Sequence, residues 1–179
     1  ELLQHVDVDV FSQADAHRPE IDGARWFHQR SFDTAESLRG PYDATIICMG
    51  NSPFHHDALR ILARAGGATT VVSHDVNLQD MYSDALRYSP SLVSRYAHDI
   101  VWRRTGTILP DTMESYVAHR EPEFFHYNNP LSLDTVRMSE RFLVHSRTAA
   151  TLAKSEADPL LHPRIDVLKF AFRDVTAVP

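Results

Sequence analysis

The sequence predicts an α/β domain in which helices cover both faces of a mainly parallel β-sheet. Residues 44–49 and 69–73 are continuous apolar, β-branched runs, which are typical of strands buried on both faces. Between them, residues 54–65 repeat apolar side chains at helical spacing, and Gly66-Gly67 ends the pattern. A chain of 179 residues that is 43% hydrophobic has room for one core, so we expect residues 1–179 to form a single domain.

The other expected strands, taken in chain order, have weaker apolar patterns than these two. The first alternates apolar and acidic residues, as a strand with one solvated face does. The helix between the second and third strands begins at a turn in which Ser52 is the N-cap and Pro53 is the first helical residue. Strand, helix and strand then form a βαβ unit with parallel strands, which predicts a Rossmann-like three-layer sandwich. The expected strands are residues 6–11, 44–49, 69–73, 141–145 and 165–170.

The second half of the chain contains the longest departure from this alternation. Residues 78–104 have a helical pattern in two pieces, broken near Pro90 because proline restricts the residue before it. Residues 121–130 have the composition of a loop, and helices are expected at 132–141 and 148–156. A doubly wound sheet normally begins with its central strand and a phosphate-facing turn, and no residue before Val6 fits that strand. The front of the chain is therefore expected to be trimmed, or the sheet to have an unusual order.

Charge and composition narrow the class of function. The formal net charge of −6, with no run of Lys or Arg, disfavours binding to the phosphate backbone of nucleic acid. No stretch approaches the ~18 apolar residues of a membrane helix. The single cysteine, Cys48, lies in an apolar run, so we expect a buried, inert thiol, which fits a reducing cytoplasm. The chain opens at Glu1 without an apolar leader, which favours a cut piece or a mature chain.

Polar residues directly follow the strand at 44–49, in the segment Gly50-Asn-Ser-Pro-Phe-His-His56. Open α/β sheets bind ligands at the carboxyl ends of their strands, where the N–H groups that begin the next helix are unpaired. Helix capping accounts for Ser52 and Pro53. Asn51 and His55 are the candidates for contact with a ligand.

A second polar group follows the strand at 69–73 and contains His74, Asp75 and Asn77. An imidazole and a carboxylate are placed together here, at the edge where Asn51 is also expected. The alternative for His74 is a buried structural imidazole bonded to a carbonyl group. The position at a strand end favours a functional role.

The third group is Val144-His-Ser146, after the strand at 141–145. Either the Ser146 hydroxyl or Thr148 can cap the next helix, and capping alone is enough to account for Ser146. A metal site is not favoured, because adjacent histidines on a helix point about 100° apart and His55 and His56 can hardly share one ion. The sequence also has no dinucleotide-binding glycine motif, no Walker loop and no nucleophile elbow.

Taken together and in order, three segments resemble one family. Tyr42-Asp-Ala-Thr-Ile-Ile-Cys-Met-Gly-Asn-Ser-Pro-Phe-His55, Val71-Val-Ser-His-Asp-Val-Asn-Leu78 and Glu140-Arg-Phe-Leu-Val-His-Ser-Arg147 are similar to the amino-terminal domain of the retaining GT-B glycosyltransferases of glycosyltransferase family 4. The resemblance covers roughly residues 42–170. It implies two Rossmann-like domains that face each other, the first holding the acceptor and the second the nucleotide-sugar.

The resemblance also implies roles for single residues. His74 would reach the transferred sugar and Asp75 would support it, so these two are the expected catalytic residues. The expected substrate-binding residues are Asn51, His55, Asn77 and Ser146. No cofactor or metal is expected beyond the nucleotide-sugar co-substrate. The implied partners are that donor and an acceptor, which is a sugar, a lipid or another small molecule. Peripheral contact with a membrane is compatible with these partners.

The chain departs from the family pattern at both ends. The family's first strand and glycine-rich loop have no visible counterpart, and neither do the Lys/Arg and paired-Glu motifs of its carboxy-terminal donor domain. We therefore expect the chain alone to be inactive. The residues leave two other functions open. One is a metal-dependent phosphohydrolase that uses His74 and Asp75 with the other histidines, and the other is a non-catalytic ligand-binding or interaction domain.

Overall fold

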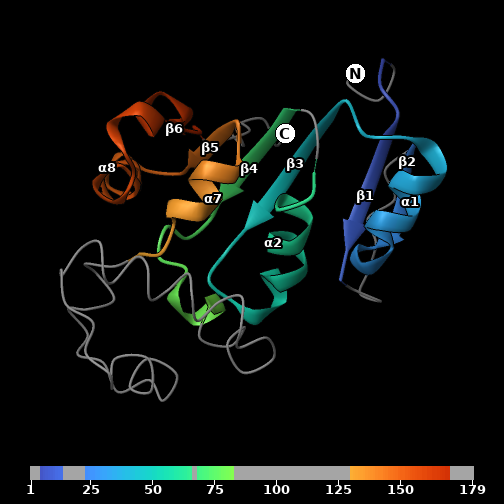
Figure 1. The fold of residues 1–179 in the computed structure, drawn as a ribbon, viewed down its shortest axis with the longest axis horizontal. Coiled ribbons are helices and arrows are strands. Elements are labelled where there is room, and N and C mark those ends of the chain that lie inside the picture. Colours follow the sequence, from blue (N-terminus) through green and yellow to red (C-terminus); the bar gives the residue numbers. More distant parts are fainter. Residues whose placement is uncertain (1–4, 14–22, 66–67, 83–129, 170–179) are drawn as a thin grey trace, which may run out of the picture.

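The predicted fold class is confirmed: the chain is an α/β protein whose strands pair in parallel and are flanked by helices, consistent with a Rossmann-like three-layer sandwich (Figure 1). The computed structural model describes residues 5–13, 23–65, 68–82 and 130–169. Its strands are β1 (Val8–Ser12), β2 (Ala24–His28), β3 (Ala44–Met49), β4 (Ala68–Ser73), β5 (Arg141–Val144) and β6 (Ile165–Val167). Its helices are α1 (Phe32–Arg39), α2 (His56–Leu62), α7 (Leu133–Met138) and α8 (Arg147–Glu156), with 3₁₀ turns η2 (Gln29–Ser31), η3 (Pro53–His55) and η4 (Pro159–Arg164).

Four strands form one sheet in the order β3-β4-β5-β6, and every neighbouring pair is parallel. The register places one buried row across the sheet, consisting of Ile47, Val71, Phe142 and Ile165. Because side chains alternate along a strand, this row marks the face that carries the core. The predicted βαβ unit is present as β3, α2 and β4.

One layer of helices covers that face: α2 packs on β3, α7 on β5, and α8 on β5 and β6, while α7 also contacts both other helices. On the opposite face of β3, Ile46 is 73% exposed and Cys48 is also exposed. The expectation of a buried thiol at Cys48 is therefore wrong. The reason is the alternation along β3, because its apolar run supplies a core row and a second row that no helix of the described residues covers.

A second sheet consists of β1 and β2, which are parallel and in register from Val8 opposite Ala24 to Ser12 opposite His28. Tyr42, just before β3, donates a hydrogen bond to Asp9 of β1 at 2.8 Å. Beyond the other end of β1, the Gln13 amide donates to the Phe54 carbonyl at 2.9 Å. β1 and β3 therefore run in the same direction, with side-chain ties at both ends.

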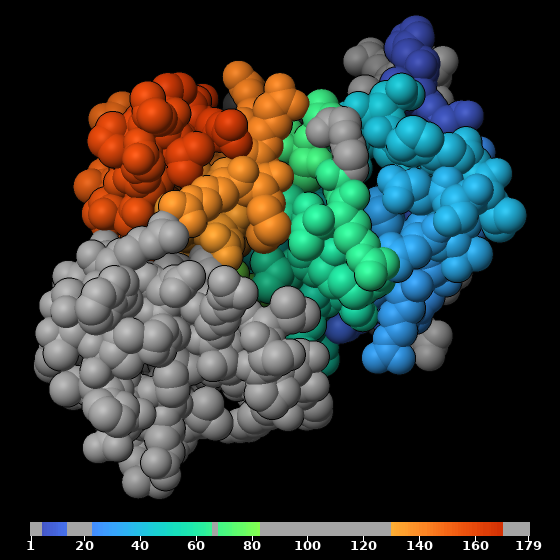
Figure 2. Space-filling model, viewed as in Figure 1, coloured from blue at the N-terminus to red at the C-terminus, as the bar shows by residue number. Residues whose placement is uncertain are grey.

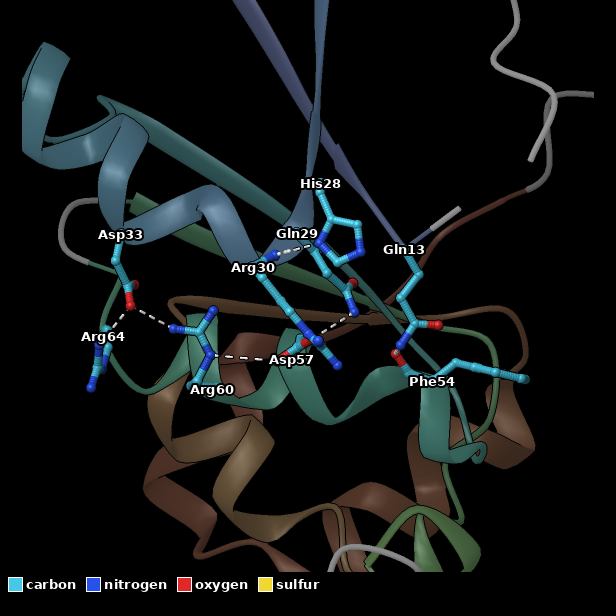
Figure 3. Close-up of polar contacts among 9 residues, drawn as sticks. All are labelled: Gln13, His28, Gln29, Arg30, Asp33, Phe54, Asp57, Arg60 and Arg64. Atoms are coloured by element: carbon cyan, nitrogen blue, oxygen red, sulfur yellow. Dashed lines mark hydrogen bonds and ion pairs between the residues drawn. The ribbon is translucent and has the colours of Figure 1, made fainter. Parts of the chain in front are cut away.

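Polar side chains also join α1 and η2 to α2 (Figure 3). Asp33 of α1 accepts hydrogen bonds from Arg60 at 2.6 Å and Arg64 at 2.7 Å. The Gln29 amide of η2 donates to Asp57 of α2 at 3.0 Å. The space-filling view shows the result, with the blue and cyan amino-terminal elements packed directly against the green α2 (Figure 2).

Several elements depart from the sequence prediction. β2 and α1 were not expected at all. The strand expected at 165–170 ends at Val167, and the helix expected at 132–141 is shorter at both ends. The predictions for residues 83–104, 121–129 and Gly66-Gly67 lie outside the described residues.

Candidate functional site

Polar residues gather where β3, β4 and β5 end, at the carboxyl edge of the four-stranded sheet. Met49 is opposite Ser73 and Ser73 is opposite Val144, so the residues that follow these three strands are neighbours in space. The backbone continues the pairing by one step, because the His74 N–H donates to the Met49 carbonyl at 2.8 Å. His74, Asp75 and His145 are thereby brought beside the turn that contains Gly50.

Gly50 is the point at which His55 and Asp75 approach each other. A Cβ atom on Gly50 would lie 2.9 Å from His55 Cε1, 3.3 Å from His55 Nε2 and 3.4 Å from Asp75 Oδ2. The first distance is shorter than real contacts, so only glycine leaves room for the observed position of the His55 ring. The Asp75 carboxylate is held here by the Asn51 N–H, which donates to Asp75 Oδ2 at 3.1 Å.

The imidazole of His55 is half-buried, and its Nδ1 lies 3.0 Å from the Ser52 hydroxyl. Burial lowers the pKa of His55 below its ordinary value, and the neighbouring His74 lowers it further. A hydrogen bond with the Ser52 backbone and the charge of Asp75 oppose this change without cancelling it. The environment of His55 therefore favours the neutral ring, which donates a hydrogen bond from one nitrogen and accepts one at the other.

The side chain of His74 is exposed, unlike the enclosed structural histidine that was its alternative. Its ring stacks on that of His145, with centroids 5.1 Å apart and ring planes at 29°. The described residues offer no hydrogen bond to the ring nitrogens of His74. Its polar edge is thus available to a ligand.

Asn51 and Asn77 have scaffold contacts in this structure. The Asn51 amide oxygen accepts from the Asp80 N–H at 2.8 Å and the Met81 N–H at 3.3 Å, and its nitrogen donates to Asp80 Oδ2 at 2.8 Å. Asn77 Oδ1 accepts from the Gln79 N–H at 3.1 Å. Both side chains therefore support the helical turn at residues 79–82, which begins beside the site.

Ser146 is the N-cap of α8, and its hydroxyl accepts from the Ala149 N–H at 3.1 Å. Ser52 has the N-cap position before η3, but its hydroxyl contacts His55 instead of a backbone N–H. The Ser146 hydroxyl is therefore used to cap α8, whereas the Ser52 hydroxyl contributes to the site by orienting the His55 ring.

The metal-dependent alternative finds no ligand set in the described part of the chain, where no three His, Cys, Asp or Glu side chains are arranged to hold an ion. His56 turns elsewhere, because its Nε2 lies 2.9 Å from the Met81 carbonyl.

Comparison with models of known families, with curated proteins and with solved structures found no match to this chain. Among the described residues, no helix is both long and apolar enough to span a membrane.

Sequence reasoning missed two members of the site, Gly50 and His145. Both lie within segments that carried the family resemblance, so the signal was their position directly after a strand. The register between β4 and β5, which pairs the ends of those strands, could not be read from either segment alone.

Proposed function

We propose that this chain is the acceptor-side half of a retaining nucleotide-sugar glycosyltransferase, with the donor held by a second α/β domain. The observation that carries the proposal is the grouping of His55, His74 and Asp75 at one carboxyl edge, with the His74 ring exposed. The resemblance of the three segments around these residues supports it.

The chemistry of the site suits a hydroxyl-rich ligand. A neutral imidazole can donate to one hydroxyl and accept from another, and the Asp75 carboxylate is an acceptor only. Transfer of a sugar develops positive charge on the sugar ring and negative charge on the departing diphosphate, which fixed dipoles and charges stabilise. In this proposal, His74 holds a hydroxyl of the transferred sugar, and Asp75 contributes negative charge beside it.

The first test uses the chain as it is. Half of a two-walled site buries too little of a sugar nucleotide to offset the freedom lost on binding, so calorimetry with a panel of nucleotide-sugars should show weak binding at most. No turnover is expected. Tight binding or measurable transfer by the chain alone would show that the donor site is not elsewhere.

The second test is His74→Ala in a protein that joins this chain to its donor domain. Transfer should fall by about 10²-fold or more, the scale of losing one positioned catalytic contact, with little change in melting temperature. His28→Ala is the matched control, because His28 is also exposed but belongs to β2 and contacts only the Arg30 N–H in the described residues. Undiminished transfer in His74→Ala would refute the role.

A further inference from the structure

The stacked pair of His74 and His145 is asymmetric. His74 is exposed, whereas His145 is half-buried and both of its ring nitrogens are inaccessible to solvent. A ring centroid separation of 5.1 Å lies within the range of favourable offset stacking. One ring is therefore held by the protein and the other rests on it.

Strand register accounts for this pairing. Ser73 of β4 lies opposite Val144 of β5, so the next residue of each strand, His74 and His145, are also neighbours. The other close groups are each bound elsewhere, His55 to Ser52 and Asp75 to the Asn51 N–H. Within the described residues, the ring of His145 is thus the remaining contact of the His74 ring.

We propose that His145 is a positioning residue, whose ring is a platform that fixes the orientation of the His74 imidazole. An exposed side chain ordinarily loses rotamer freedom when a ligand binds, and this loss of conformational entropy weakens binding. A ring already fixed by stacking avoids that loss, which is the advantage of preorganisation. The identity of the ligand as a sugar rests on the function proposed above, whereas the positioning role of His145 does not depend on that function.

Two substitutions separate a platform from a space-filling side chain. His145→Phe and His145→Leu both remove the ring nitrogens, so both lose the same hydrogen-bonding capacity and should destabilise the fold by similar amounts. Only phenylalanine retains a flat aromatic face. Melting curves of the two variants show whether the matched comparison holds.

The readout is the NMR signal of the His74 ring in the full 179-residue chain labelled at histidine. We expect His145→Leu to lose the ring-current shift of the His74 Cε1–H and to increase the mobility of that ring, whereas His145→Phe keeps the shift and the order. His28 is the internal reference, since it lies on the other sheet.

Three results would overturn the proposal: His74 signals that are unchanged in His145→Leu, equal loss of order in both variants, or a His74 ring that is already mobile in the unmodified chain. None of them depends on transfer of sugar. If His74→Ala leaves transfer intact while the platform result holds, the proposed function fails and the positioning role remains.

Discussion

The observed position of the His55 ring requires that residue 50 has no side chain. Gly50 does not have a positive φ, so its glycine is required by space and not by backbone conformation. The Cβ of an alanine would meet Cε1 at the far end of the His55 ring, which can swing away at small cost. The site is thus more sensitive to this position than the fold is.

Gly50→Ala should therefore displace the His55 ring into solvent. Because burial is the main cause of the lowered pKa of His55, the pKa should rise towards its ordinary value, which NMR titration of the imidazole measures. The melting temperature should change little.

Gly40→Ala is the contrasting variant. Gly40 has φ 91° and ψ 170°, a region that is essentially confined to glycine, and no atom lies within 4 Å of an added Cβ. It should lower the free energy of unfolding by about 1–3 kcal/mol and leave the titration of His55 unchanged. If His55 keeps its lowered pKa in Gly50→Ala, the proposed crowding between the alanine Cβ and the His55 ring is wrong.

At the scale of elements, helix α8 shows that Ser146 is accounted for by local structure. Ser146→Ala should remove the N-cap bond to Ala149 and lower the free energy of unfolding by about 1 kcal/mol. Thr151→Ala in the same helix is the control, because the Thr151 hydroxyl only bonds back to the Arg147 carbonyl. Alanine is the better helix former there, so stability should stay the same or rise by a few tenths of a kcal/mol, on the order of its propensity advantage.

Urea unfolding of the two variants measures this difference. Equal stability of Ser146→Ala and the unmodified chain would mean that the hydroxyl is not a cap, and would reopen a role for Ser146 in ligand binding.

The elements that sequence reasoning found are those with a strong local signal. β3, α2 and β4 were predicted because a buried run, a proline start and a helical stripe follow one another. β2 and α1 were missed; α1 buries only Phe32 and Ala35, and its remaining residues are polar except for Leu38, which is 81% exposed. Tertiary contacts stabilise these two elements, and such contacts between distant segments leave no local pattern.

The same limit applies to the site. His55, His74 and Asp75 were predicted from their places after strands, whereas the stacking of His145 on His74 depends on register. The exposure of Cys48 was missed for a related reason. A continuous apolar run indicates a strand covered on both faces, but the coverage of the second face is a property of the assembled layers.

At the scale of the whole molecule, Asp9 joins the two sheets. Its carboxylate is 1% exposed and accepts hydrogen bonds from Arg25 of β2, Arg39 of α1 and Tyr42 at the start of the β3 segment. Burial alone would raise the pKa of Asp9, but the bonds from Arg25 and Tyr42 and the two positive charges outweigh it, so the pKa is lowered. Asp9 is therefore ionised throughout the neutral range and binds its three partners as an anion.

Tyr42 is the partner whose titration can be followed separately. Burial, together with the hydrogen bond to Asp9 and the charge of Asp9, raises the pKa of Tyr42 to about 12. A group whose pKa is raised on folding contributes its full stabilisation below its unfolded pKa, here about 10, and loses it as the pH rises through the folded value. The tie between the sheets should therefore weaken between about pH 10 and about pH 12.

Tyr42→Phe removes the hydroxyl and should lower the free energy of unfolding at pH 7 by about 1.5 kcal/mol, the lower range for a hydrogen bond to a charged group, because Tyr42 is only half-buried. The difference between the variant and the unmodified chain should narrow as the pH rises from about 10 to about 12, since only the unmodified chain loses the bond there. Urea unfolding across that range measures the difference, in which the titration of lysines and other tyrosines cancels. In an Asp9→Asn background, the substitution should cost less and its pH dependence should be smaller, because the charge of Asp9 no longer adds to the effect of burial on the pKa of Tyr42. A difference that stays constant up to pH 12 in the original background would mean that the hydroxyl of Tyr42 does not tie the two sheets through Asp9.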